Sequence, residues 1–251
     1  YVPQWFPVPE IKMMAQTFGA FETIHAVAYS YLNDTLGLDD FEAFLEDKAT
    51  MDKLSILMEV DHNTTDIKEI ARSLALFSAA AEGIQLFSSF AVLLSFKKSN
   101  RLVGIGKQME FSVRDESLHS EAGCKLFRTL CEENKGLLEE IQSDIYQGID
   151  LALKNEFNYI DKIFEMGDLE TINKIQLKNF MFDRANRKLQ ELGLKPVYDV
   201  NSELLSEMSW FYVAVSGEQQ TDFFANRESG CLLYTSPSPR DLSTSRMPSS
   251  A

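Results

Sequence analysis

Two short segments of the sequence place a glutamate three residues before a histidine. Glu22 precedes His25, and Glu116 precedes His119. Residues three apart lie on one face of an α-helix, so each segment would present a carboxylate beside an imidazole. A single pair of this kind is commonly a surface ion pair. Two pairs on separate helices with apolar surroundings are instead typical of a carboxylate-bridged site for two metal ions.

A tyrosine extends the first pair along the same helix face. Tyr29 lies four residues after His25 and seven after Glu22, which keeps the three side chains on one side of the helix. Burial of these polar groups on an otherwise apolar helix is costly unless they have partners. The third histidine, His62, lies in a polar break, and we expect it to be a solvated loop residue.

A further acidic candidate lies inside the most apolar stretch of the chain. Glu82 is flanked by small residues at 79–81 and 83. An unpaired carboxylate there would cost several kcal/mol, so it needs a partner, either a metal ion or an arginine from a neighbouring helix. On an α-helix, Leu86 and Phe90 would share its face and form an apolar wall beside the metal.

Asp115 adjoins Glu116 but points about 100° away around the helix. There it could accept a hydrogen bond from a metal-bound histidine. It could equally be a surface aspartate that pairs with Arg114 or Lys107, and its spacing leaves both interpretations open.

The elements that would position these residues are helices. After a proline-punctuated, extended entry over residues 1–9, the apolar periodicity predicts helices over 10–32, 39–48, 50–60, 67–98, 102–133, 139–166, 169–192 and 202–215. Strand signals are nearly absent, so we predict an all-α bundle that forms one domain over residues 1–230. Residues 231–251 resemble a translated sequencing adapter, and we expect a non-native, disordered tail without a functional role.

Composition limits the possible partners and the compartment. The formal charge of −14 argues against binding of nucleic acid or of an anionic membrane surface. No apolar run reaches the roughly 18–20 residues that a membrane span needs. Three cysteines without a spacing pattern indicate a reducing, cytoplasmic environment. Cys124 and Cys131 lie seven residues apart, and core packing is their expected role.

In combination, the segments ETIHAVAY, AAAEGIQLFSSF and RDESLH resemble the small, radical-bearing subunit of class I ribonucleotide reductase. The later segments FDRANRKLQELGL and SGEQQTDFFANR fit the closing region of that family, so the resemblance covers residues 1–227. It implies a ferritin-like helical bundle with a carboxylate-bridged dimetal centre.

The resemblance also implies a ligand set for two metal ions. Glu22 and Glu116 would bridge the metals. His25 would complete one metal together with an acidic residue expected about ten positions upstream of Tyr1, and Glu82 and His119 would complete the other. The cofactor would be two iron ions, although these ligand types also permit manganese.

The same resemblance gives two residues a role in radical chemistry. Tyr29 would be oxidised to a stable tyrosyl radical after dioxygen activation. Asp115 would bond to His25 and join the radical-transfer path. Leu86 and Ser112 occupy positions beside the radical where the family often has larger apolar side chains.

The implied partners are a large subunit that carries the nucleotide site and a second copy of the small subunit in a homodimer. The upstream ligand, an upstream tryptophan and the natural C-terminal tail are not in the sequence, so we expect this chain alone to be inactive. Two alternatives belong to the same fold: another dimetal oxidase or oxygenase, and a metal-storage bundle. Tyr29 argues against the first, and the long region after Leu192 argues against the second.

Overall fold

The computed structural model describes residues 2–38, 46–58 and 63–216, and this part of the chain contains helices and no strand. The helices are α1 (Val2–Trp5), α2 (Pro9–Leu36), α4 (Lys48–Met58), α5 (Ile67–Ala75), η1 (Leu76–Gln85), α6 (Phe87–Lys98), α7 (Val103–Glu133), α8 (Leu137–Ile163), α9 (Lys174–Glu191), α10 (Ser202–Glu207) and α11 (Ser209–Val215).

Residues 1–215 form one compact unit. The prediction of an all-α bundle is therefore confirmed for the described residues. Three other expectations lie outside them: most of the helix over 39–48, the loop position of His62, and the tail after residue 230.

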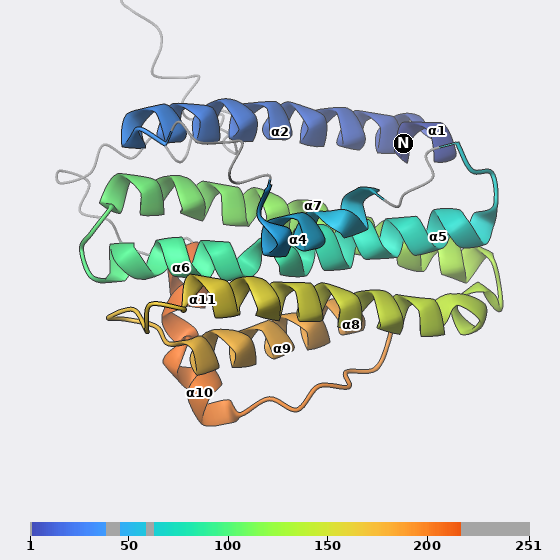
Figure 1. The fold of residues 1–251 in the computed structure, drawn as a ribbon. Coiled ribbons are helices and arrows are strands. Elements are labelled where there is room, and N and C mark those ends of the chain that lie inside the picture. Colours follow the sequence, from blue (N-terminus) through green and yellow to red (C-terminus); the bar gives the residue numbers. More distant parts are fainter. Residues whose placement is uncertain (1, 39–45, 59–62, 217–251) are drawn as a thin grey trace, which may run out of the picture. The chain divides into compact units, whose positions relative to one another are not determined.

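Helices α5, η1 and α6 follow one another with almost no break and form the centre of the core. These three helices pack against α7, α8 and α9, and α2 lies on the side of α7 that faces away from them (Figure 1). Small residues allow these close contacts. A Cβ atom added to Gly123 of α7 would lie 1.9 Å from Ser78 Oγ, and one added to Gly148 of α8 would lie 2.3 Å from Leu76 Cδ2.

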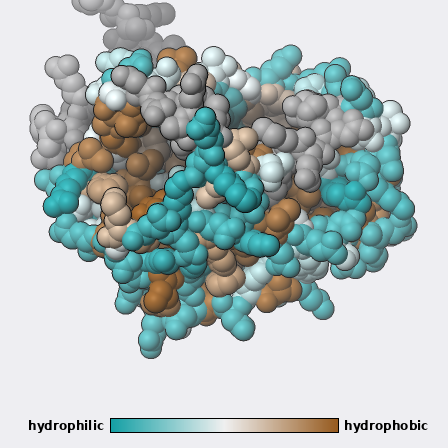
Figure 2. All heavy atoms as spheres, viewed as in Figure 1, coloured by the Kyte–Doolittle hydropathy of each residue, from teal (hydrophilic) through white to brown (hydrophobic). Residues whose placement is uncertain are grey.

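The sequence predicted that no apolar run is long enough to cross a membrane. By length and composition alone, the helical residues 67–98 could do so. However, 61% of the most apolar window is buried inside the protein, as in the core helix of a bundle. On the face shown in Figure 2, hydrophilic side chains predominate, with smaller hydrophobic patches between them.

The prediction of one regular α-helix over 67–98 was wrong in its middle. Residues Leu76–Gln85 form a π-helix, whose turns are wider than those of an α-helix. Consequently, Leu86 and Phe90 do not follow Glu82 at the α-helical spacing that the sequence suggested. Phe90 is nevertheless buried, and Leu86 packs against the core.

Three other helix boundaries differ from the prediction. The entry was predicted to be extended, but α1 forms a single turn in which the Phe6 amide donates to the Val2 carbonyl. Helix α9 begins later than predicted, because Asn173 and Gln176 form a capping box there. The predicted last helix is divided in two at Met208.

Candidate metal centre

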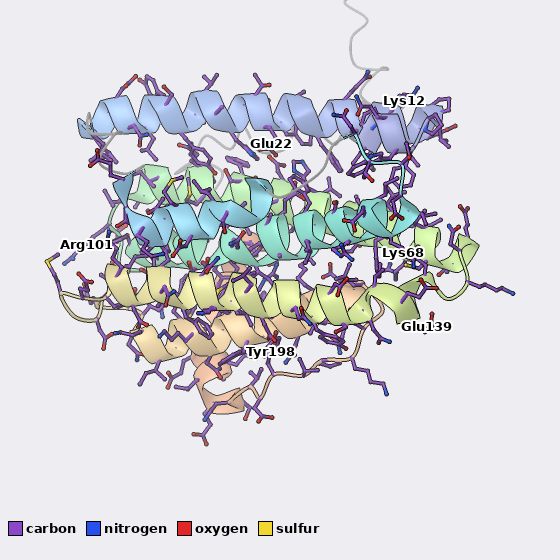
Figure 3. The ribbon with its side chains drawn as sticks, turned by 45° about the vertical axis from the view of Figure 1, so that its right-hand side comes forward. Lys12, Glu22, Lys68, Arg101, Glu139 and Tyr198 are labelled. Atoms are coloured by element: carbon purple, nitrogen blue, oxygen red, sulfur yellow. The ribbon has the colours of Figure 1, made fainter. Side chains whose placement is uncertain are left out.

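Helices α2 and α7 bring the two Glu-x-x-His pairs together. Nδ1 of His119 lies 3.1 Å from Glu22 Oε1, and Nδ1 of His25 lies 3.1 Å from Glu116 Oε1. Each histidine thus faces the glutamate of the other helix. Ligand atoms of Glu22, Glu116 and His119 all lie within 4.8 Å of one another. Figure 3 shows Glu22 on the side of α2 that faces the inner helices.

The π-helix η1 contributes a third carboxylate. Oε1 of Glu82 lies 4.0 Å from His119 Nδ1, and its side chain is 15% exposed. The alternative of an arginine partner is not what the described residues show, because Arg184 donates to the carbonyl oxygen of Gly83 instead. All five predicted ligands therefore meet at one place, from three helices.

The ionisable side chains of the site shift one another's pKa values. The imidazole of His119, followed by that of His25, lowers the pKa of Glu22 to about 2. The neighbouring carboxylates of Glu116 and Glu22 raise the pKa of His25 to about 10. Burial, with repulsion from Glu116 and Glu22, raises the pKa of Glu82 to about 9. At neutral pH these shifts leave Glu82 protonated and His25 charged, and a bound cation would displace both protons, because metal ligands bind in their deprotonated forms.

The donor atoms fit a transition metal. His25 Nδ1 is buried without a hydrogen-bond partner, although it faces two carboxylates. A nitrogen in this position is a suitable ligand atom. Carboxylate oxygens with imidazole nitrogens, and no thiolate, match the preferences of iron and manganese.

Asp115 holds the other nitrogen of His25. Its Oδ2 lies 3.0 Å from His25 Nε2. Of the two interpretations that spacing left open, the structure shows the one in which Asp115 orients the histidine. Such a carboxylate fixes the ring and its tautomer, so that Nδ1 stays directed at the centre.

Tyr29 lies beside the centre and is half-buried. The centroid of its ring lies 6.1 Å from that of His25. Its hydroxyl donates a 2.8 Å hydrogen bond to Ser112 Oγ. Burial raises the pKa of Tyr29, so the phenol is protonated at neutral pH. The sequence did not identify Ser112 as this partner, although its position four residues before Glu116 places it on the same face of α7.

A cavity of about 360 Å³ adjoins the metal side of the site. Its walls include the apolar side chains of Phe18, Phe77 and Leu126, and three candidate ligands, Glu22, Glu82 and His119, also line it. The ring of Phe18 lies 4.2 Å, between centroids, from that of His119. The cavity lining is thus largely apolar, although the Glu22 side chain that borders it is 52% exposed.

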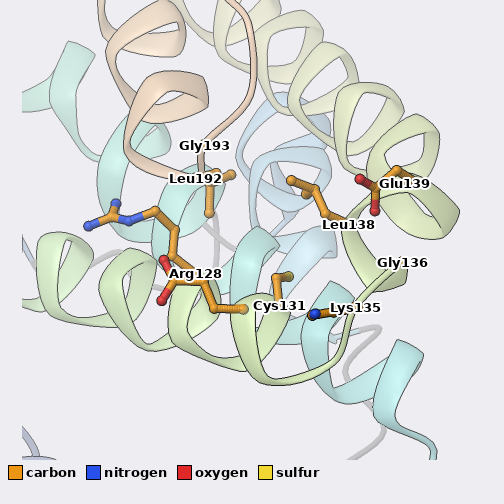
Figure 4. Close-up of a pocket in the computed structure, with 9 residues that line it drawn as sticks. Arg128, Cys131, Lys135, Gly136, Leu138, Glu139, Leu192 and Gly193 are labelled. Carbon is orange, nitrogen blue, oxygen red and sulfur yellow. The ribbon is translucent and has the colours of Figure 1, made fainter.

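Two cysteines lie in the described part of the chain, and neither belongs to the cluster of Glu22, Glu116 and His119. Cys124 is in the core, where burial raises the pKa of its thiol to about 12. Cys131 lines a shallow pocket where α7 meets α8 (Figure 4), and burial raises its pKa to about 11. Both thiols are free and protonated at neutral pH, as expected for cysteines that serve packing.

The family profile and the related sequences indicate the same protein family. The sequence profile of the family "Ribonucleotide reductase, small chain" matches residues 3–204. A ribonucleoside-diphosphate reductase small subunit of Invertebrate iridescent virus 3 is 33% identical over 246 residues, which cover 89% of this chain and 64% of the viral protein. The beta subunit of the Chlamydia pneumoniae enzyme is 26% identical, with coverage of 87% and 66%. The chain thus spans less than two thirds of the length of these relatives.

Solved structures share the fold. A class I ribonucleotide reductase of Bacillus halodurans superposes with a TM-score of 0.75 at 20% identity, over 84% of this chain and 77% of that one. The dimanganese(II)-NrdF protein of Streptococcus sanguinis gives a TM-score of 0.70 at 19% identity, over 83% and 72%.

Proposed function

Because the chain belongs to the family of ribonucleotide reductase small chains, we propose that it is the radical-bearing subunit of a class I ribonucleoside-diphosphate reductase. One observation carries the proposal. The Glu-x-x-His pairs of α2 and α7 meet Glu82 of η1, and a half-buried tyrosine lies next to them.

In the proposed site, Glu22 and Glu116 would each be shared by two metal ions, since each carboxylate lies close to both histidines. His25 would hold one ion, and His119 and Glu82 would hold the other. The ions would be iron, with manganese also compatible with these donors. When bound, the metal pair would supply the activation of dioxygen and an acceptor for one electron.

Tyr29 is the proposed source of that electron. Tyr29 would lose one electron and the proton of its hydroxyl, which the hydrogen bond directs towards Ser112 Oγ as its acceptor. The side chain is half-buried, so the resulting radical is shielded from solvent. Asp115 accepts a hydrogen bond from His25 Nε2, and its side chain is 32% exposed at the edge of the centre, where a radical path would leave it.

The proposed assembly contains a large subunit, which reduces the ribonucleotide, and a second small subunit, in the cytoplasm. One feature of α2 supports a further chain at its outer side. Of its residues only His25 is buried, whereas Ile24, Val27 and Tyr31 are 62%, 67% and 75% exposed. These three share one helix face, which a second copy would cover.

The test is electron paramagnetic resonance on the chain, extended to the length of its family relatives, after loading with iron(II) and exposure to dioxygen. We expect a tyrosyl radical signal. The variant Tyr29→Phe should bind the same amount of iron and lose the signal, while Tyr31→Phe, with an exposed ring on the same helix, should keep it.

A radical that survives in Tyr29→Phe would contradict the assignment of Tyr29. Iron binding and dioxygen consumption without any radical in the native protein would favour the alternative of another ferritin-like dimetal oxidase.

A further inference from the structure

Side chains of α7 and α9 hold the π-helix η1 through its backbone. The backbone groups of a π-helix pair over five residues instead of four, and each carbonyl oxygen keeps a second lone pair that can accept a hydrogen bond from a side chain. Two carbonyl oxygens of η1 receive such hydrogen bonds from side chains far away in the sequence. Glu82 lies between them, next to the second.

The first donor comes from α7. Ser120 is fully buried, and its hydroxyl donates a 2.6 Å hydrogen bond to the Ser78 carbonyl oxygen. Ser120 directly follows His119, so the residue that holds η1 is adjacent to the histidine that Glu82 faces. Helices α7 and η1 are in close contact here, because Gly123 has no side chain and there is no room for one against Ser78.

The second donor comes from α9. Nη2 of Arg184 donates a 3.0 Å hydrogen bond to the carbonyl oxygen of Gly83, the residue after Glu82. The Arg184 guanidinium also stacks on Phe87, with Cζ 3.6 Å from the ring centroid. The aliphatic stem of Lys188 lies against Gly83, since a Cβ atom there would be 2.6 Å from Lys188 Cδ.

Arg184 is not explained by stability alone. It is 7% exposed, and its hydrogen bond goes to a neutral carbonyl oxygen, not to a carboxylate. Burial of a guanidinium without a carboxylate is unfavourable, and an apolar side chain of similar size would commonly be as stable. The contact that accounts for Arg184 is therefore the one with the backbone of η1.

We propose that Arg184 and Ser120 are positioning residues of the metal centre. By fixing the Gly83 and Ser78 carbonyl groups, they set the rotation of η1 and so keep the Glu82 carboxylate directed at His119. This inference rests on the proposed metal site. It adds that two residues which contact none of the ligand side chains determine how well Glu82 binds.

The experiment measures the dissociation constant of the 251-residue chain for Mn²⁺, by electron paramagnetic resonance of the free ion. Arg184→Met keeps a long side chain but removes the donor. Loss of a hydrogen bond made directly to a metal ligand typically weakens binding about 10- to 100-fold, and for a donor one residue away from the ligand we expect about the lower end of this range. Arg184→Lys returns a donor and should recover part of the affinity.

Arg187→Met is the matched control. Arg187 lies on the same helix, carries the same charge, and pairs with Asp183 rather than with η1, so its variant should bind Mn²⁺ like the native chain. Ser120→Ala removes only a hydroxyl and should also weaken binding. It carries the test if circular dichroism shows that Arg184→Met does not fold.

The outcomes separate the two proposals. If the native chain binds Mn²⁺ and folded Arg184→Met and Ser120→Ala bind it equally well, the positioning role is wrong and the metal site stands. If the native chain binds no better than Glu116→Gln, the metal site itself is wrong, and the positioning role fails with it. Weakening in Arg187→Met equal to that in Arg184→Met would also overturn the role, because the effect would then be one of charge alone.

Discussion

Lys53 of α4 and Glu156 of α8 form an ion pair inside the bundle, and Lys53→Met tests how strongly the fold depends on it. Nζ of Lys53 lies 3.3 Å from Glu156 Oε2, and the two side chains are 11% and 0% exposed. Ser88 also donates to Glu156, and the Lys53 ammonium lies 4.1 Å from the Tyr159 ring centroid. Methionine preserves most of the stem volume but leaves a buried carboxylate without its cation.

Removal of one partner of a buried pair costs about 3–5 kcal/mol, because the remaining charge is desolvated and uncompensated. For a chain of this size that loss lowers the melting temperature by on the order of 10 °C. Lys48 provides the control on the same helix. Its side chain is 85% exposed and pairs with Asp52, so Lys48→Met should cost less than about 1 kcal/mol.

The loss in Lys53→Met should depend on pH. Burial raises the pKa of Glu156, and Lys53 opposes this rise. Without Lys53 the pKa of Glu156 rises further, so the folded state binds the proton more tightly than the unfolded state does. The contribution of the protonated carboxyl is complete below the unfolded pKa and is lost as the pH rises through the folded pKa. The gap between Lys53→Met and the native chain should therefore widen from acidic to neutral pH.

Urea unfolding followed by far-UV circular dichroism measures these differences. The double variant Lys53→Met/Glu156→Leu should recover most of the stability, because it removes the stranded charge together with its partner. Equal losses in Lys53→Met and Lys48→Met, or a loss that does not change with pH, would refute the reasoning.

Two further predictions concern packing and metal binding. Gly123→Ala should cost about 1–3 kcal/mol in urea unfolding through overpacking, since the new Cβ atom would lie 1.9 Å from Ser78 Oγ, whereas Gly104→Ala on the same helix meets nothing within 4 Å and should not destabilise. Mn²⁺ at 100 times its dissociation constant should stabilise the native chain by about 2.7 kcal/mol in thermal unfolding. Glu116→Gln should show a smaller shift at the same concentration, and an equal shift would contradict the proposed site.

The sequence predicted the ligand-bearing helices well because they are long and regular. Over α2 and α7 the α-helical period holds, so spacing alone placed Glu22 with His25 and Glu116 with His119 on shared faces. The same argument failed over Leu76–Gln85. Alanine, leucine and glutamine there favour an ordinary α-helix, and the donors to the wide segment, Ser120 and Arg184, are distant in sequence.

Spacing also left the partner of Asp115 undecided. The helical period gives the direction of a side chain, but it does not say which other helix lies in that direction. The docking of α2 on α7 decides it, and this docking is itself unusual. Apart from the half-buried Tyr29, α2 contributes little apolar surface to the core, and His25 is its one buried residue. Within the described residues, α2 makes its polar contacts with other helices at the site: His25 with Asp115 and Glu116, Glu22 with His119, and Tyr29 with Ser112. The groups that would bind metal are therefore also the groups that hold α2 in place. Since a ligand stabilises the state that binds it, the stabilisation expected from Mn²⁺ should appear first in α2, as slower hydrogen exchange of its backbone amides than in the metal-free chain.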